Sequence, residues 1–116
     1  MDPRDFLVNL SNADYRMREV AVEVLHHSGN LTPEVVDKLM QILRTDSHEN
    51  VRRGAVSALR DAVPKPVGLP ELLIAALGDS DYMVRGRAFM ALTECLPGWR
   101  DSDEGIIAKT GAFANL

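Results

Sequence analysis

Three arginines recur along the chain, and each follows an acidic or amide residue at a distance of six residues. The pairs are Asn12 with Arg18, Asp46 with Arg52, and Asp79 with Arg85. A guanidinium presents a planar fork of N–H donors, which binds carboxylates and carbonyl oxygens. Such a row could bind an anionic ligand, but every arginine lies beside an apolar helical stripe. We therefore interpret the set as a structural ladder, in which the arginines satisfy helix-terminal and inter-repeat acceptors and the Asn and Asp residues are helix caps or first-turn acids.

The histidines and the cysteine are the other residues that could do chemistry. His26 and His27 are adjacent, so on a helix they point about 100° apart and are poorly placed to bind one ion. Glu23 and His27 are better spaced, but no third or fourth ligand accompanies them. Cys95 falls on an apolar stripe, where a buried and inert thiol is expected. We predict neither a metal site nor a cofactor.

Sequence motifs and composition narrow the class of protein. The chain has no phosphate-cradling glycine loop, nucleophile elbow, zincin helix or Cys/His cluster, which predicts a non-catalytic protein. Its 116 residues fit one domain with a packed core, and the net charge of -4 argues against a dedicated nucleic-acid binder. No apolar run is long enough for a membrane span, and a single cysteine excludes an internal disulfide.

The start of the chain bears on its location. Met1-Asp2-Pro3 resembles a natural start and is too acidic for a signal peptide, although the repeats described below would also suit a longer parent protein. We therefore expect a cytoplasmic protein.

An apolar pattern repeats along the chain and defines one helix per repeat, helix B. Met17, Val51 and Val84 are each followed by Ala four residues later and by Leu eight residues later. Offsets of four and eight residues lie on one stripe of a helix. The stripe is widened by Val22, Val56 and Phe89. A shorter amphipathic segment, helix A, precedes each B helix.

Proline and capping residues indicate where the A helices begin. Pro3, Pro33 and Pro70 suit the first helical position, and Asp2 and Thr32 are candidate caps. The sequence therefore predicts an all-α chain of three helical hairpins, followed by a short C-terminal half-repeat that covers the last apolar face. The expected repeats span residues 3–29, 31–63 and 69–97, and the tail spans 98–116.

These residues resemble the HEAT repeat, in particular its short form, the PBS-lyase HEAT-like subclass. The family pattern Asp-x-x-x-x-Val-Arg-x-x-Ala-x-x-x-Leu is met in full by the second and third repeats, from Asp46 and Asp79 onward. The first repeat departs from it at Asn12 and Met17, which leaves one rung of the ladder without an acidic acceptor. The resemblance implies a right-handed α-α superhelix whose B helices line a concave, partner-binding side. It also implies a scaffold or adaptor, with minorities of the family accompanying lyases or holding damaged DNA.

The side of the B helices opposite the apolar stripe is the expected functional surface. Counting 100° per residue, it carries Arg16, Glu19, Glu23, His26, His27, Asn50, Arg53, Ser57, Arg60, Asp61, Met83, Arg87, Met90 and Glu94. Met83 and Met90 share this polar side, where flexible apolar side chains suit an adaptable contact. With Arg53, Arg60 and Arg87 they form the predicted partner-binding patch, and a solvated face without function is the plain alternative. Reversing the charge of Arg53 and Arg60 is expected to weaken partner capture with little loss of stability.

Trp99 follows a Pro-Gly break and has two interpretations. It either covers the end of the third repeat or, as a tryptophan often does, anchors an interface, so it is included among the candidate partner-binding residues.

The sequence predicts a non-catalytic protein-interaction module that serves as a scaffold or adaptor. The expected partner is another protein, and an open apolar end of the stack would favour a homodimer or a larger complex. Two alternatives remain: an accessory subunit of a lyase or cofactor-maturation enzyme, and nucleic-acid binding through Arg53, Arg60 and Arg87.

Overall fold

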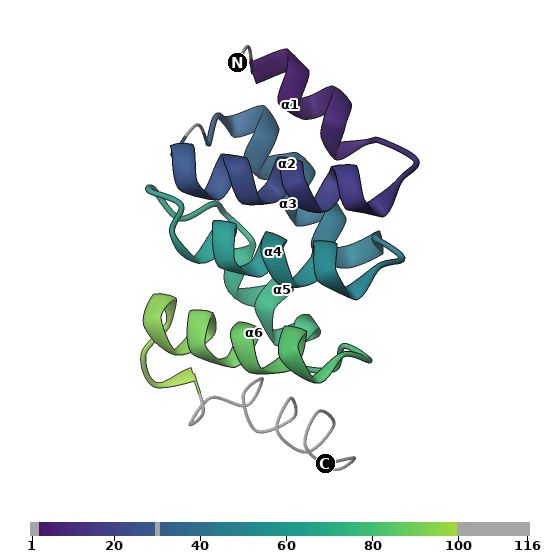
Figure 1. Cartoon of the computed structure of the whole chain (residues 1–116). Coiled ribbons are helices and arrows are strands. Elements are labelled where there is room, and N and C mark those ends of the chain that lie inside the picture. Colours follow the sequence, from purple (N-terminus) through teal and green to yellow (C-terminus); the bar gives the residue numbers. More distant parts are fainter. Residues whose placement is uncertain (1–2, 30, 100–116) are drawn as a thin grey trace.

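The described part of the computed structural model, residues 3–29 and 31–99, consists of helices joined by short loops and contains no strand. The helices are α1 (Pro3–Leu10), α2 (Tyr15–Ser28), α3 (Pro33–Thr45), α4 (Glu49–Arg60), α5 (Leu69–Ala76) and α6 (Tyr82–Cys95). They follow one another as three hairpins stacked from the N-terminus downward in Figure 1. The predicted all-α solenoid is confirmed.

The stack has two layers. The B helices α2, α4 and α6 pack side by side in one layer, and the A helices α1, α3 and α5 pack in the other (Figure 1). Each A helix also packs against the B helix that follows it. Successive B helices therefore share one surface, and a site on this layer can draw on all three repeats.

The B helices begin two residues later than the cap prediction required. Asp14, His48 and Asp81 are the N-caps of α2, α4 and α6, and their side chains accept a backbone N–H of the first turn. The predicted caps, Asn12, Asp46 and Asp79, instead accept the backbone N–H of these capping residues at 2.8, 2.9 and 2.9 Å. An Asp or Asn side chain commonly binds the backbone two residues on, which forms a turn. The cap assignment was wrong because this turn precedes the helix.

The starts of the A helices agree better with prediction. Thr32 caps α3, with its Oγ1 accepting the N–H of Val35, and Pro33 is the first helical residue. Pro70 stands one position later in α5, which begins at Leu69 after Gly68. Gly68 has a φ of 87°, a left-handed conformation that favours glycine. The candidate cap Asp2 lies outside the described residues.

The shared apolar stripe forms the core in the second and third repeats but not throughout the first. Val51 and Val84 are fully buried, as are the alanines and leucines four and eight residues after them. Met17, predicted to be equivalent, leaves 45% of its surface exposed. The difference arises because α1 and α2 form the first pair of the described stack, in which no other pair packs against this end. Val20 and Val24 are exposed on the same helix, at 53% and 39%.

Trp99 covers the third repeat at the other end of the stack. It is 1% exposed and packs edge-on against Phe89, with ring centroids 5.5 Å apart. Its Nε1 donates to Thr93 Oγ1 at 3.1 Å. The assignment of Trp99 to a partner-binding surface was therefore wrong, and the covering interpretation holds. The rest of the predicted half-repeat, residues 100–116, lies outside the described residues.

Within the described ranges, none of the helices is both long and apolar enough to cross a membrane.

Candidate functional site

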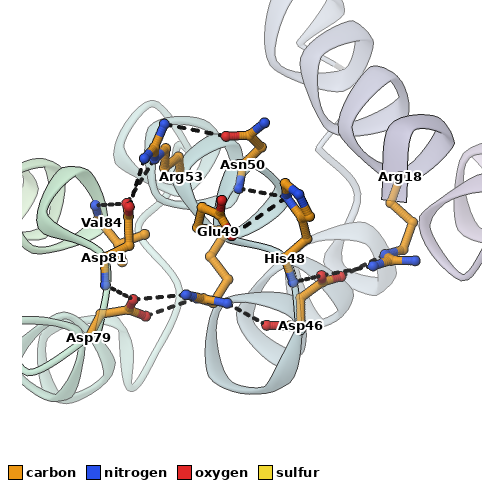
Figure 2. Close-up of polar contacts among 10 residues, drawn as sticks. Arg18, Asp46, His48, Glu49, Asn50, Arg53, Asp79, Asp81 and Val84 are labelled. Atoms are coloured by element: carbon orange, nitrogen blue, oxygen red, sulfur yellow. Dashed lines mark hydrogen bonds and ion pairs between the residues drawn. The ribbon is translucent and has the colours of Figure 1, made fainter. Parts of the chain in front are cut away.

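The ladder arginines join consecutive repeats. Arg18 on α2 donates from Nε and Nη2 to the carboxylate of Asp46, at 2.8 and 3.0 Å, and from Nη1 to the backbone carbonyl of Asn12 at 2.8 Å. Figure 2 shows Arg18 reaching across to Asp46. The Asp46 carboxylate raises the pKa of Arg18, mainly through this hydrogen bond. The guanidinium thus fixes the position of one repeat relative to the next.

The next rung repeats this geometry. Arg52 donates from Nε and Nη2 to the two carboxylate oxygens of Asp79, both at 3.0 Å, and from Nη1 to the carbonyl of Asp46 at 2.8 Å. In both rungs, the arginine therefore donates to the backbone carbonyl of the residue six positions before it. The carboxylate with which the arginine pairs belongs to the following repeat. Asn12 needs no charge for this role, and Arg18 pairs with the carboxylate of Asp46, so the expectation that Asn12 leaves one rung without an acidic acceptor is wrong.

The third rung differs from the other two. Arg85 Nη1 donates to the carbonyls of Asp79 and Ser80, at 2.9 and 3.2 Å. Its Nε is buried and has no hydrogen-bond partner among the residues that the structure describes. The carboxylate that completes the earlier rungs comes from a following repeat, and the described chain ends its stack at α6.

A groove crosses the exposed side of the B helices. Its volume is about 440 Å³, and its lining is Glu19, Val22, Glu23, His26, His27, Asn50, Arg53, Gly54, Ser57 and Arg87. Val22 and Gly54 let α2 and α4 approach closely: a Cβ on Gly54 would lie 2.9 Å from Val22 Cγ1. This close approach of α2 and α4 therefore depends on a glycine inside a helix, where glycine otherwise lowers stability.

The arginines of the predicted patch are engaged within the protein. Arg53 donates from Nε and Nη2 to both carboxylate oxygens of Asp81, at 2.8 and 2.7 Å (Figure 2). This contact lowers the pKa of the Asp81 carboxyl to about 2. Arg60 forms a bidentate pair with Glu94, and Arg87 Nη1 donates to Ser57 Oγ at 3.2 Å.

These contacts change two expectations about the patch. Charge reversal of Arg53 would place a carboxylate against Asp81, so we now expect it to lower stability, contrary to the sequence-based expectation. The nucleic-acid alternative loses its main support, because carboxylates of the same chain already neutralise Arg53 and Arg60.

The structure brings together only part of the predicted patch. Arg53 and Arg87 line the groove, whereas Arg60, Met83 and Met90 are not among its lining residues. Met90 is 54% exposed and Met83 is half-buried.

Two groove features carried no role in the sequence analysis. Glu19 had been placed on this side without a function, Glu23 had been weighed only as a metal ligand beside His27, and Gly54 had not been noticed. The sequence also contained a pattern that could have identified Asp81 as a helix cap. A polar residue stands two positions after each of the ladder residues Asn12, Asp46 and Asp79.

The histidines and Cys95 are the other residues that the sequence singled out for possible chemistry. Within residues 3–29 and 31–99, no group of three His, Cys, Asp or Glu side chains could hold a metal ion. His26 Nε2 lies 2.5 Å from Asp61 Oδ2, which joins α2 to the end of α4. Cys95 is half-buried rather than buried as predicted, and this burial raises the pKa of its thiol. A raised pKa leaves little of the reactive thiolate at neutral pH.

Comparison with known families agrees with this geometry. The family model for HEAT repeats matches residues 4–93, which spans all three hairpins. The chain is a HEAT-repeat protein. The match is to HEAT repeats in general and does not distinguish the lyase-related subclass. No curated protein and no solved structure gives a significant match to this HEAT-repeat chain.

Proposed function

We propose that this HEAT-repeat protein is a non-catalytic scaffold or adaptor that binds another protein in the groove across α2, α4 and α6. The groove is the observation that carries the proposal: it is a continuous hollow on the surface that successive B helices share. HEAT repeats commonly bind proteins, and the ladder supports this use. Ion pairs between consecutive repeats hold the B helices in register, so the groove is formed before a partner arrives.

Site-specific photo-crosslinking tests this proposal. A photoreactive residue replaces His27, which is exposed and lines the groove, and a control chain carries it at Ala75, which is exposed on α5. We expect His27 to crosslink a defined protein that the Ala75 position does not, and the purified protein to rebuild the complex with the unmodified chain. Equal labelling from both positions would contradict the proposal.

Self-association remains a prediction. The surface it would use is the aliphatic end of the first repeat, where Val8, Val20 and Val24 are exposed. Sedimentation velocity over a range of concentrations tests it, with Val20→Glu as the variant expected to stay monomeric.

The cytoplasmic location also remains a prediction, supported by the absence of any second cysteine in the sequence. Fractionation of cells tests it.

A further inference from the structure

The groove carries an uneven distribution of unneutralised charge. Glu19 and Glu23 lie one turn apart on α2. Among the described residues, neither side-chain carboxylate has an ion-pair or hydrogen-bond partner. On the opposite side, Arg87 of α6 contacts the neutral hydroxyl of Ser57 and has no carboxylate within ion-pair distance among the described residues. Between them, Arg53 is neutralised by Asp81. The groove is therefore negative over α2 and positive at Ser57 of α4, which Arg87 reaches from α6.

From this charge order, and on the basis of the proposed protein-binding role of the same groove, we infer that the partner contributes an extended segment with separated charges. Its Lys or Arg side chains pair with Glu19 and Glu23, and an Asp or Glu at its other end pairs with Arg87. Arg53 and Arg60, which the sequence also marked as part of the binding patch, are not main determinants, because each already has a carboxylate partner.

The dimensions of the helix layer set the length of the segment. Arg87 reaches back from α6 to Ser57 on α4, so its guanidinium lies over α4. Neighbouring packed helices lie roughly 8 to 10 Å apart, so the two charged ends of the groove are separated by on the order of 10 Å. An extended chain advances about 3.3 Å per residue. The basic and acidic ends of the bound segment are therefore separated by about three residues.

The charges make this recognition directional and salt-dependent. Charges at the edge of an interface set register and partner choice more than raw affinity, and they are screened by salt. A segment with the opposite charge order meets like charges at both walls. Such a segment binds only in the reverse direction. The spacing of its charged residues therefore predicts binding, whereas its amino-acid composition alone does not.

Selection from a displayed library of random twelve-residue peptides on the folded chain tests the inference. We expect enriched peptides to carry Lys or Arg about three residues from Asp or Glu. Affinity for a selected peptide should fall at least about tenfold with Glu19→Lys/Glu23→Lys. The matched control is Glu34→Lys/Glu71→Lys, the same charge change at exposed positions of α3 and α5, where we expect unchanged affinity. A peptide with its basic residues changed to Glu should bind the Glu19→Lys/Glu23→Lys chain better than it binds the original chain.

The outcomes separate this inference from the proposed function. Ser57→Met, shown by circular dichroism to remain folded, obstructs the groove with an uncharged side chain and so acts whatever the charge of the ligand. Selected peptides that lose binding to Ser57→Met but lack the basic and acidic ends would overturn the charge inference and leave the groove as a binding site. Peptides that bind Ser57→Met unchanged, or no enrichment at all, would overturn the proposed function itself.

Discussion

Arg52 and Asp79 face each other across the boundary between the second and third repeats, with both hydrogen bonds of the guanidinium fork at 3.0 Å. Each side chain is only 12% exposed. Asp79 also accepts the backbone N–H of Asp81, the residue that caps α6. One carboxylate therefore fixes the spacing of two repeats and the start of a B helix.

Removing this carboxylate should destabilise the fold. We expect Asp79→Ala to lower the free energy of unfolding by about 2 to 3 kcal/mol, because it leaves a mostly buried guanidinium without its counter-charge. Asp79→Asn keeps an acceptor for the Asp81 N–H and should therefore lower the free energy of unfolding by less than Asp79→Ala does. Urea denaturation measures both variants. Asp37→Ala, at an exposed position on α3, is the control, and a loss no larger than that of the control would show that the ladder does not stabilise the stack.

The contact between Arg53 and Asp81 should make stability depend on acid pH. The pKa of Asp81 falls from an ordinary 3.8 to about 2 in the folded chain. A carboxyl with a lowered folded-state pKa stabilises the fold above its unfolded pKa and ceases to do so as pH falls through the folded one. Asp81→Asn, which can still cap the helix, should therefore be less stable than the original chain near neutral pH.

The difference between the two chains should shrink between about pH 4 and pH 2, as followed by thermal unfolding across that range. Arg53→Gln should remove the same pH dependence. A difference that stays constant down to pH 2 would show that this ion pair does not contribute to stability.

Gly54 and Gly86 form a matched pair of helical glycines. A Cβ at Gly54 would lie 2.9 Å from Val22 Cγ1, whereas a Cβ at Gly86 meets nothing within 4 Å. We expect Gly86→Ala to stabilise the chain by roughly 0.5 to 1 kcal/mol through helix propensity. Gly54→Ala should instead cost about 1 to 3 kcal/mol, because the added methyl overpacks the contact between α2 and α4. Thermal unfolding of the two variants distinguishes these effects, and equal shifts would mean that the helices are not closely packed at Gly54.

Trp99 is the only tryptophan and reports on the last repeat. Its burial predicts blue-shifted fluorescence that acrylamide quenches poorly until the chain unfolds. We expect Trp99→Ala to cost about 3 to 5 kcal/mol, and Thr93→Val about 1 kcal/mol through loss of the hydrogen bond to Nε1. Fluorescence typical of an exposed indole in the folded chain would contradict the covering role.

The sequence predicted the parts of the fold that depend on local periodicity. Val51, Ala55 and Leu59 recur at helical spacing, and their burial follows from that spacing alone. Met17 shares the spacing but is exposed, because its burial would require a neighbouring pair that the described stack does not have. Periodicity identifies the face of a helix that is apolar, and packing decides whether anything covers it.

The candidate site was harder to predict, because its chemistry depends on contacts between repeats. Arg53 was correctly placed on the outward side of α4, but its partner Asp81 lies 28 residues away, and no local pattern identifies that pair. Glu19 and Glu23 were placed on the same side, yet they became notable only when the structure showed their neighbours paired elsewhere. The unneutralised charges of a surface become apparent only once its ion pairs are known.

The most direct test of the groove as a protein-binding site is an NMR titration of the isotope-labelled chain with a peptide from the selection described above. The account predicts chemical-shift changes concentrated at Glu19, Ser57 and Arg87, with little change on α3 and α5. Changes concentrated on α3 and α5, with the groove residues unaffected, would contradict it.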